Sequence, residues 1–254
     1  MMLALVTGAG GGLGEAIARH LAREGWRLAV ADRDDAAAEA VARSLPHARA
    51  FGVDVRDEKA VEAMLDAIGE APDGVVNNAG IVRFGPILEH RIEDFREVLD
   101  VNLVGTFIVA RAAGRRMAER GSGAIVNITS LNAVAPSPDA GAYPASKAGV
   151  ALLTQHLALA LGPRGVRVNA VGPGFIDAGM SAPIYADPAA RAARSAAVPL
   201  RSLGEAGDVA SVVAFLLSDG ARYVTGQHML VDGGVSFSLK DHLPRKAPER
   251  RDGR

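Results

Sequence analysis

Tyr143 and Lys147 are the residues whose types and spacing first suggest catalysis. They bracket the segment YPASK, residues 143–147, in a run of small residues. Residues four apart lie on one face of a helix, and a nearby ammonium lowers the pKa of a phenol from its ordinary value of about 10. Tyr143 could therefore take a proton from an alcohol or give one to a carbonyl. The alternative is a half-buried tyrosine beside an exposed lysine, because this pattern also occurs by chance in many proteins.

A glycine-rich segment, TGAGGGLG at residues 7–14, joins a predicted strand to a predicted helix. Glycines at such a junction let the backbone turn tightly and approach a pyrophosphate, which then lies at the N-terminus of the helix. The segment lacks the G-x-G-x-x-G register when read from Gly8. It fits G-x-x-x-G-x-G, with Gly8, Gly12 and Gly14, and also G-x-x-G-x-x-G through Gly11. A purely structural turn is the alternative interpretation.

Asp32 ends the second predicted strand, eighteen residues after Gly14. A carboxylate at this place accepts hydrogen bonds from the adenosine ribose hydroxyls of a dinucleotide and repels a 2′-phosphate. The position therefore predicts NAD rather than NADP as the cofactor. Arg33, the next residue, keeps NADP open as an alternative, because a guanidinium could pair with that phosphate.

Short apolar runs alternate with helical patterns along most of the chain. A repeated order of strand, helix and strand predicts a parallel sheet with helices on both faces. We therefore expect an α/β fold with a doubly wound, Rossmann-like parallel sheet of about seven strands. The expected strands cover residues 3–8, 27–32, 48–55, 74–80, 123–130, 166–174 and 228–234, and the two longest helical patterns cover 92–119 and 143–161.

No linker divides the first 235 residues, so we predict a single domain over residues 1–238. Ligands of such sheets bind outside the carboxyl ends of the strands, where the glycine-rich segment and Asp32 fall. Residues 175–200 interrupt the alternation and are expected to form a substrate loop, a candidate lid. A polar, basic tail is predicted at residues 239–254, loosely attached or disordered, with a nucleic-acid arm as the weaker alternative.

Composition and charge exclude several classes of function. The formal net charge of −1 gives no electrostatic case for a nucleic-acid or membrane partner. The chain has no cysteine, which excludes disulfides and thiol catalysis, and its six histidines are scattered, so no metal site is expected. Neither a signal peptide nor an apolar stretch of membrane-spanning length is present. We expect a cytoplasmic protein.

Several motifs in order carry a family resemblance. They are TGAGGGLG, Asp32, the pair Asp54–Val55, NNAG at 77–80, Asn102 in DVNLVG, Ser130 in NITS, YPASK, the PG pair at 173–174 and VDGG at 231–234. From Leu3 to about Gly234 the chain resembles the single-domain branch of the short-chain dehydrogenase/reductase family. Ser130 stands thirteen residues before Tyr143, a spacing that this family favours.

The resemblance implies roles for individual residues. Ser130 would hydrogen-bond the substrate oxygen, Tyr143 would be the general acid and base, and Lys147 would bind the nicotinamide ribose and lower the tyrosine pKa. Asn102 would hold a water in a proton relay. Independently of the resemblance, the small side chains of Ala142, Ala145, Ser146 and Ala148 around Tyr143 are expected to let the cofactor ribose approach. The residues implied in cofactor binding are Gly8, Gly12, Leu13, Gly14, Asp32, Asp54, Val55, Asn78, Ala79, Gly80, Tyr143, Lys147, Pro173 and Ile176.

One departure from the family pattern concerns Ala178, where the family usually has a threonine that reaches the nicotinamide carboxamide. Ser181 or Asp177 would be its replacement. We expect an NAD-dependent oxidoreductase acting on a small-molecule secondary alcohol or ketone, and a homotetramer, with a dimer as the alternative. An epimerase or dehydratase on the same scaffold, or an NAD-binding regulator without turnover, are the other hypotheses. The identity of the substrate does not follow from the residues.

Overall fold

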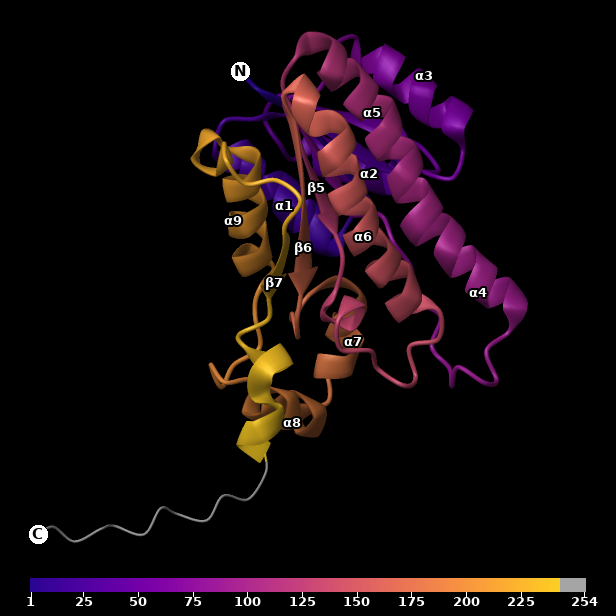
Figure 1. Ribbon diagram of the computed structural model, residues 1–254, viewed down its shortest axis with the longest axis vertical. Coiled ribbons are helices and arrows are strands. Elements are labelled where there is room, and N and C mark those ends of the chain that lie inside the picture. Colours follow the sequence, from indigo (N-terminus) through magenta and orange to yellow (C-terminus); the bar gives the residue numbers. More distant parts are fainter. Residues whose placement is uncertain (243–254) are drawn as a thin grey trace, which may run out of the picture.

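The apolar runs of the sequence become strands because each is buried within a sheet. In the computed structural model, which describes residues 1–242, seven parallel strands form one sheet in the order β3-β2-β1-β4-β5-β6-β7 (Figure 1). The predicted doubly wound, seven-stranded fold is therefore confirmed. The strands are β1 (Leu3–Thr7), β2 (Arg27–Asp32), β3 (Ala48–Gly52), β4 (Gly74–Asn77), β5 (Gly123–Ile128), β6 (Val166–Pro173) and β7 (His228–Val231).

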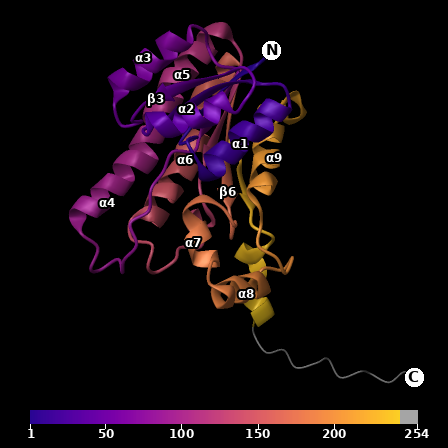
Figure 2. The ribbon, with the colours of Figure 1, turned by 180° about the vertical axis from the view of Figure 1, so that it is seen from behind.

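One face of the sheet is covered by three helices that share an apolar core. Ile17 and Leu21 of the first helix are fully buried against Val213 and Leu216 of the last. Full burial of each such side chain stabilises the fold by about 2 kcal/mol. Figure 2 shows this face. Its helices are α1 (Gly12–Arg23), α2 (Asp35–Arg43) and α9 (Ala206–Leu217).

The opposite face, in front in Figure 1, carries a second core. Val61 and Leu65 meet Val109, Met117 and other buried side chains there. With helices on both faces, β1 has no solvent-facing side, and all five of its residues are buried. The covering helices are α3 (Glu58–Ile68), α5 (Thr106–Arg120) and α6 (Tyr143–Leu161).

The helical pattern at 92–119 is not one uniform helix. It consists of α4 (Ile92–Leu99), a π-helical turn η1 (Asp100–Gly105) and then α5. A π-helical turn inserts an extra residue into the helix and often marks a functional site. Asn102, a poor helix former, lies within this turn and is fully buried.

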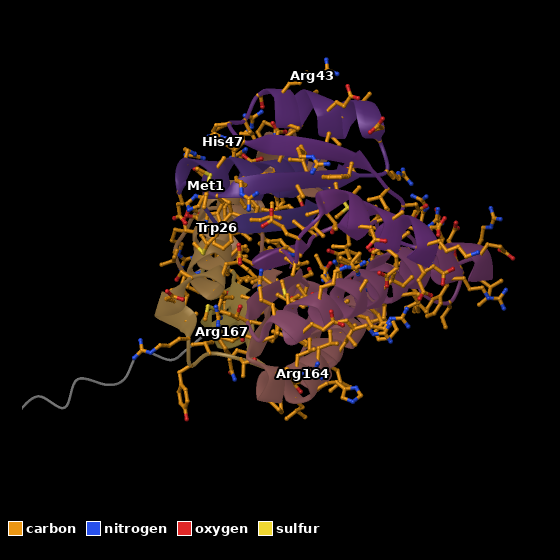
Figure 3. All side chains as sticks on the ribbon, turned by 90° about the horizontal axis from the view of Figure 1, so that it is seen from above. Met1, Trp26, Arg43, His47, Arg164 and Arg167 are labelled. Carbon is orange, nitrogen blue, oxygen red and sulfur yellow. The ribbon has the colours of Figure 1, made fainter. Side chains whose placement is uncertain are left out.

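Trp26 and Arg167, both labelled in Figure 3, lie at the amino ends of β2 and β6. Trp26 is buried beside Leu217, with its ring against Gly74. Arg167 donates hydrogen bonds to the carbonyls of Leu216 and Leu217 at 2.6 and 3.3 Å. A cation at these carbonyls stabilises the C-terminal end of α9.

The predicted loop at 175–200 contains short helices. They are η4 (Gly179–Ser181), α7 (Ala182–Tyr185) and α8 (Pro188–Ala197). Of the tail predicted at 239–254, residues 239–242 end the helix η6 (Val235–His242), and residues 243–254 lie outside the described part of the chain.

Two kinds of feature are absent from the described residues. Among residues 1–242, no helix is both long enough and apolar enough to cross a membrane. Over the same residues, no three or more His, Asp or Glu side chains are grouped so that they could hold a metal ion.

Candidate active site

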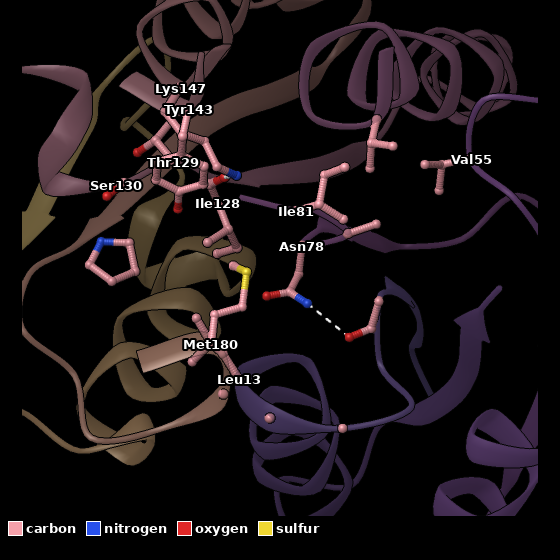
Figure 4. A pocket seen from close by; sticks show the side chains of 18 of the residues that line it. Leu13, Val55, Asn78, Ile81, Ile128, Thr129, Ser130, Tyr143, Lys147 and Met180 are labelled. Carbon is pink, nitrogen blue, oxygen red and sulfur yellow. Dashed lines mark hydrogen bonds between the residues drawn. The ribbon is translucent and has the colours of Figure 1, made fainter. Parts of the chain in front are cut away.

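A cleft of about 420 Å³ opens at the carboxyl ends of the strands (Figure 4). Every residue predicted as catalytic or cofactor-binding lines this cleft, except Gly14 and Asn102. Figure 4 shows Ser130, Tyr143 and Lys147 together on one side, with Val55 on the opposite side. Residues far apart in the sequence are therefore brought to one elongated site.

The glycine-rich turn forms one wall of the cleft. Gly8 and Gly12 have φ angles of 63° and 57°, a left-handed conformation that side chains disfavour. α1 begins at Gly12, so the unpaired N–H groups of its first turn lie beside the cleft. Such a helix start favours an anion.

Gly14 lies behind the turn, where it permits a close contact. A Cβ at Gly14 would stand 2.1 Å from the carbonyl oxygen of Gly8 and 2.5 Å from Nδ2 of Asn78. That amide donates to the carbonyls of Thr7 and Gly8 at 3.1 and 3.0 Å. Asn78 therefore ties the end of β4 to the glycine-rich turn, and Gly14 supports the turn without lining the cleft.

Asp32 has a structural contact that the sequence did not indicate. Its Oδ2 accepts a hydrogen bond from the N–H of Gly10 at 2.9 Å, and Oδ1 accepts one from Asp34 at 3.1 Å. The carboxylate thus holds the glycine-rich turn while lining the cleft next to Arg33.

Asp54 lies at the same end of the cleft and is paired with Arg56. Its carboxylate accepts from Nε and Nη2 of Arg56 at 3.0 and 2.6 Å. This hydrogen bonding is the main cause that lowers the pKa of Asp54, and the charge of Arg33 contributes further. Asp54 therefore stays ionised well below neutral pH. Beside it, the Val55 side chain packs against Gly105 of η1.

Ser130 and Tyr143 meet at the other end of the cleft. The N–H of Asn132 donates to Ser130 Oγ at 3.1 Å, so the serine hydrogen remains available to another oxygen. Burial raises the pKa of Tyr143 above its ordinary value, and a hydrogen bond with Ser130 opposes this effect. Lys147 was expected to lower the pKa of Tyr143. In the protein alone the pKa of this phenol is instead raised, because burial outweighs the other effects.

Lys147 is buried and held by the backbone. Its Nζ donates to the carbonyl oxygen of Ile128 at 2.8 Å and lies 5.6 Å from the centre of the Tyr143 ring. Burial lowers the pKa of this ammonium from 10.5 to about 8. The charged form is therefore unfavourable in the folded protein, and the stability must depend on pH.

Replacement of Lys147 by methionine should stabilise the protein at neutral pH by about 2 kcal/mol. Below pH 8 both folded and unfolded chains carry the proton, so the folded state bears the full cost of the buried charge. Between about pH 8 and 10.5 the folded chain loses its proton first, and the wild type gains stability as pH rises. Urea unfolding at neutral and alkaline pH measures this difference. An advantage of Lys147→Met that does not shrink at alkaline pH would contradict a buried ammonium.

Asn102 does not line the cleft but stands behind its wall. Its Nδ2 donates to the Ile81 carbonyl and to Ser146 Oγ, both at 3.0 Å, and its Oδ1 accepts from the Ile81 N–H at 2.8 Å. Oδ1 also lies close to Gly80, as does Nζ of Lys147. Asn102 thereby joins η1 to the segment that follows β4.

The segment after β6 reaches back to the glycine-rich turn. A Cβ at Gly12 would stand 2.9 Å from Cα of Gly179, so the two glycines allow a close approach of the chains. Pro173, Ile176 and Met180 line the cleft from the same segment. Both Gly179 and Met180 belong to the predicted substrate loop at 175–200, but the contact of Gly179 with Gly12 was not predicted, because local patterns carry no signal for a contact between residues 167 positions apart.

Thr129 was also missed, although the rule that ligands lie at the carboxyl ends of strands would have included it. It follows β5, lines the cleft and donates from Oγ1 to the carbonyl of Val171 at 2.9 Å. The predicted approach of the ribose to Ala145 and Ser146 is not supported, because neither lines the cleft and Ser146 is fully buried.

Comparison with known proteins agrees with this architecture. Residues 8–236, which include the whole cleft, match the family model described as enoyl-(acyl carrier protein) reductase. The chain belongs to the short-chain dehydrogenase/reductase family. This confirms the resemblance that the motifs indicated, and it makes the protein an oxidoreductase of a family that binds nicotinamide cofactors.

Individual relatives of the short-chain dehydrogenase/reductase family match over nearly their whole length. The chain is 40% identical to a 3beta-hydroxysteroid dehydrogenase 1 of Eggerthella lenta, covering 92% of this chain and 93% of that one. It is 39% identical to an L-rhamnose 1-dehydrogenase (NAD(P)(+)) of Azotobacter vinelandii, covering 93% and 97%. A 3-oxoacyl-[acyl-carrier protein] reductase with bound NAD from Brucella melitensis superimposes with a TM-score of 0.85, at 33% identity, over 92% and 91%.

Proposed function

We propose that the protein is an NAD-dependent dehydrogenase that interconverts a secondary alcohol and its ketone. The observation that carries this proposal is the cleft itself, with Ser130, Tyr143 and Lys147 at one end and the glycine-rich turn with Asp32 at the other. Related proteins are named for the oxidation of steroid and sugar alcohols and the reduction of 3-oxoacyl groups. These names fit a cleft whose Ser130, Tyr143 and Lys147 end performs the same acid–base chemistry on different alcohols and ketones.

The residues of the cleft fit a dinucleotide. The helix start at Gly12 would take the pyrophosphate, and the turn leaves no room for a side chain at Gly8 or Gly12. Asp32 would take the adenosine ribose and Asp54 the adenine amino group. Lys147 would hold the nicotinamide ribose. The remaining proposed contacts come from Gly8, Leu13, Val55, Asn78, Ala79, Gly80, Pro173 and Ile176, with Gly14 supporting the turn.

The acid–base end would handle the substrate oxygen. When bound, the nicotinamide ring supplies the acceptor or donor of a hydride. The Ser130 hydrogen, left available by the Asn132 N–H, would donate to the substrate oxygen and stabilise its developing charge. Tyr143 would remove the alcohol proton or return it to the ketone. Since burial disfavours the phenolate, its formation needs the nearby ammonium of Lys147.

Asn102 would complete the proton relay from behind the wall. Its side chain is already bonded to Ile81 and Ser146, while its carbonyl accepts from Thr106 Oγ1 at 2.7 Å. A carbonyl oxygen has two lone pairs, so one remains for a water that leads towards Lys147.

The direct test measures NADH formation or loss with wild-type protein. A panel of secondary alcohols is offered with NAD, and the matching ketones with NADH. We expect turnover on at least one class. Tight NADH binding without turnover on a broad panel would instead favour a regulator, and conversion of a substrate without net change in NADH would favour an epimerase or dehydratase.

The preference for NAD rests on Asp32. Asp32→Asn should narrow the preference for NADH over NADPH by about tenfold, because the variant no longer repels the 2′-phosphate. Asparagine retains one oxygen for the N–H of Gly10, which limits damage to the turn. The ratio of kcat/KM for the two cofactors measures the effect, with Arg33→Gln as the control that should shift it the opposite way. If the ratio of kcat/KM for NADH and NADPH is unchanged in Asp32→Asn, Asp32 does not select the cofactor and serves only to hold the N–H of Gly10.

We also propose that the protein assembles as a homotetramer. Apolar side chains on the outer surfaces of α5 and α6 remain exposed in the single chain, namely Phe107, Leu152 and Leu159. Exposed apolar groups on adjacent helices are suited to contact with another copy. Light scattering in solution gives the mass, and a monomer would refute the assembly.

A further inference from the structure

Ser146 has an unexpected place in the structure. Its side chain is fully buried and does not line the cleft, although Tyr143 and Lys147 of the same turns do. The hydroxyl donates to the carbonyl oxygen of Tyr143 at 2.7 Å and accepts from Nδ2 of Asn102 at 3.0 Å. A hydroxyl has one hydrogen, so these two bonds fix its orientation. Ser146 therefore bonds the first turn of α6 to the π-helical turn η1.

Further hydrogen bonds connect η1 to the wall of the cleft. The second hydrogen on Nδ2 of Asn102 is donated to the carbonyl of Ile81, and Oδ1 of Asn102 accepts a hydrogen bond from the N–H of Ile81. Ile81 follows Gly80, and both line the cleft. The amide, the hydroxyl and two backbone segments thus form a continuous path from the wall to Tyr143.

We propose that Ser146 is a positioning residue, whose hydroxyl sets the turn carrying Tyr143 and Lys147 against the Gly80–Ile81 wall. This inference rests on the proposed dehydrogenase function. Ser146 touches neither substrate nor cofactor, and it acts through the backbone of Tyr143 and the amide of Asn102. Displacements of about 1 Å between reacting groups can slow catalysis about a hundredfold, so a loosened turn should affect turnover more than binding.

Thr154 offers a matched control two turns further along α6. It is also fully buried, donates to the carbonyl of Val150 at 2.8 Å and accepts from Nδ2 of Asn127 at 2.8 Å. Removing either hydroxyl leaves one buried amide hydrogen of an asparagine without an acceptor. Ser146→Ala and Thr154→Val should therefore destabilise the protein to a similar extent. Only the first change affects the turn that carries Tyr143.

The first measurement needs no turnover. The chain has three tyrosines, so NMR of isotopically labelled tyrosine rings gives few signals, and Tyr143→Phe assigns the relevant one. Ser146→Ala should shift the Tyr143 resonance and move the pH at which it titrates, while Thr154→Val leaves both unchanged. The Ser146→Thr variant, which keeps the hydroxyl, should restore the wild-type signal. Equal Tyr143 signals in wild type, Ser146→Ala and Thr154→Val would overturn the proposal.

The second measurement is kinetic. With an active substrate, Ser146→Ala should lower kcat about tenfold or more while the NADH dissociation constant stays near that of the wild type. Equal loss of kcat in Thr154→Val would overturn the positioning role, because general destabilisation would then explain both. If wild type turns over no substrate, the proposed function fails, and the NMR comparison still decides whether Ser146 positions Tyr143.

Discussion

Tyr143→Phe should lower hydride transfer about a thousandfold or more while leaving NADH binding nearly unchanged. The change removes one oxygen atom and keeps the ring, which is partly buried at the end of the cleft. General acid–base groups contribute about 10²–10⁴-fold to a rate, and no other side chain described beside Ser130 combines a titrating hydroxyl with a neighbouring ammonium. Turnover with NAD and an active alcohol measures the rate, and NADH fluorescence titration measures binding.

Tyr223→Phe is the matched control for this experiment. Tyr223 is 99% exposed and does not line the cleft, so its hydroxyl should contribute nothing to turnover. Wild-type rates in Tyr143→Phe would refute the assigned acid–base chemistry. Equal losses in both variants would point to a general effect of the substitution on the protein.

Gly14→Ala should destabilise the protein by about 3 kcal/mol or more. Within a helix, alanine is ordinarily about 1 kcal/mol more favourable than glycine, so helix propensity alone predicts the opposite sign. The contact decides the outcome, because the new Cβ would stand 2.1 Å from the Gly8 carbonyl oxygen and 2.5 Å from Nδ2 of Asn78. A carbonyl of the glycine-rich turn cannot move away without distorting the cleft. Urea unfolding measures the loss.

Gly11→Ala is the control that tests whether the glycine-rich turn tolerates any added methyl group or is disturbed only by the contact at Gly14. A Cβ at Gly11 would have no atom within 4 Å, and its φ of −179° is extended backbone that any residue adopts. We expect its stability to stay within about 0.5 kcal/mol of the wild type. Similar unfolding midpoints for the two variants would show that the turn yields to a methyl group at Gly14.

The architecture was predictable because its signals are local and repeated. Each buried strand is a short apolar run, and each helix presents a periodic apolar face, so the order of elements implied the sheet. The position of Asp32 at the end of the second strand implied its place at the edge of the cleft. Parallel strands all bring their carboxyl ends to that edge, which is why Ser130 and Asn78 also fell there.

The contacts that were not predicted depend on tertiary structure. For Asn102 the resemblance implied a role in a proton relay, but neither the π-helical turn around it nor its bonds to Ile81 and Ser146 could be read from the sequence. Nothing in the sequence distinguished Ser146 from the small residues beside it. The approach of Gly179 to Gly12 is likewise a contact between distant segments, which local patterns cannot specify.

The effect of Lys147 on the pKa of Tyr143 could not be predicted from the sequence either. Spacing on a helix correctly placed the two side chains near each other, at 5.6 Å between Nζ and the ring centre. The sequence could not reveal that burial opposes charge on both groups, raising one pKa and lowering the other. In the protein alone the neutral phenol is therefore favoured, and the ionised pair would have to form during the reaction.

The cleft is lined by three separate stretches of chain. Residues up to Arg56 supply the glycine-rich turn, Asp32 and Asp54, residues 78–101 supply the wall at Gly80 and Ile81, and residues 128–181 supply Ser130, Tyr143, Lys147 and the segment around Met180. Under the proposed function, the side chains that would hold the adenosine end and those that would meet the substrate lie mainly in different stretches. Sequence change in the last stretch would then alter the substrate while the proposed contacts of Asp32 and Asp54 with the adenosine half are kept. Such a division would allow the different chemistries for which the relatives are named, on steroid, sugar and 3-oxoacyl compounds.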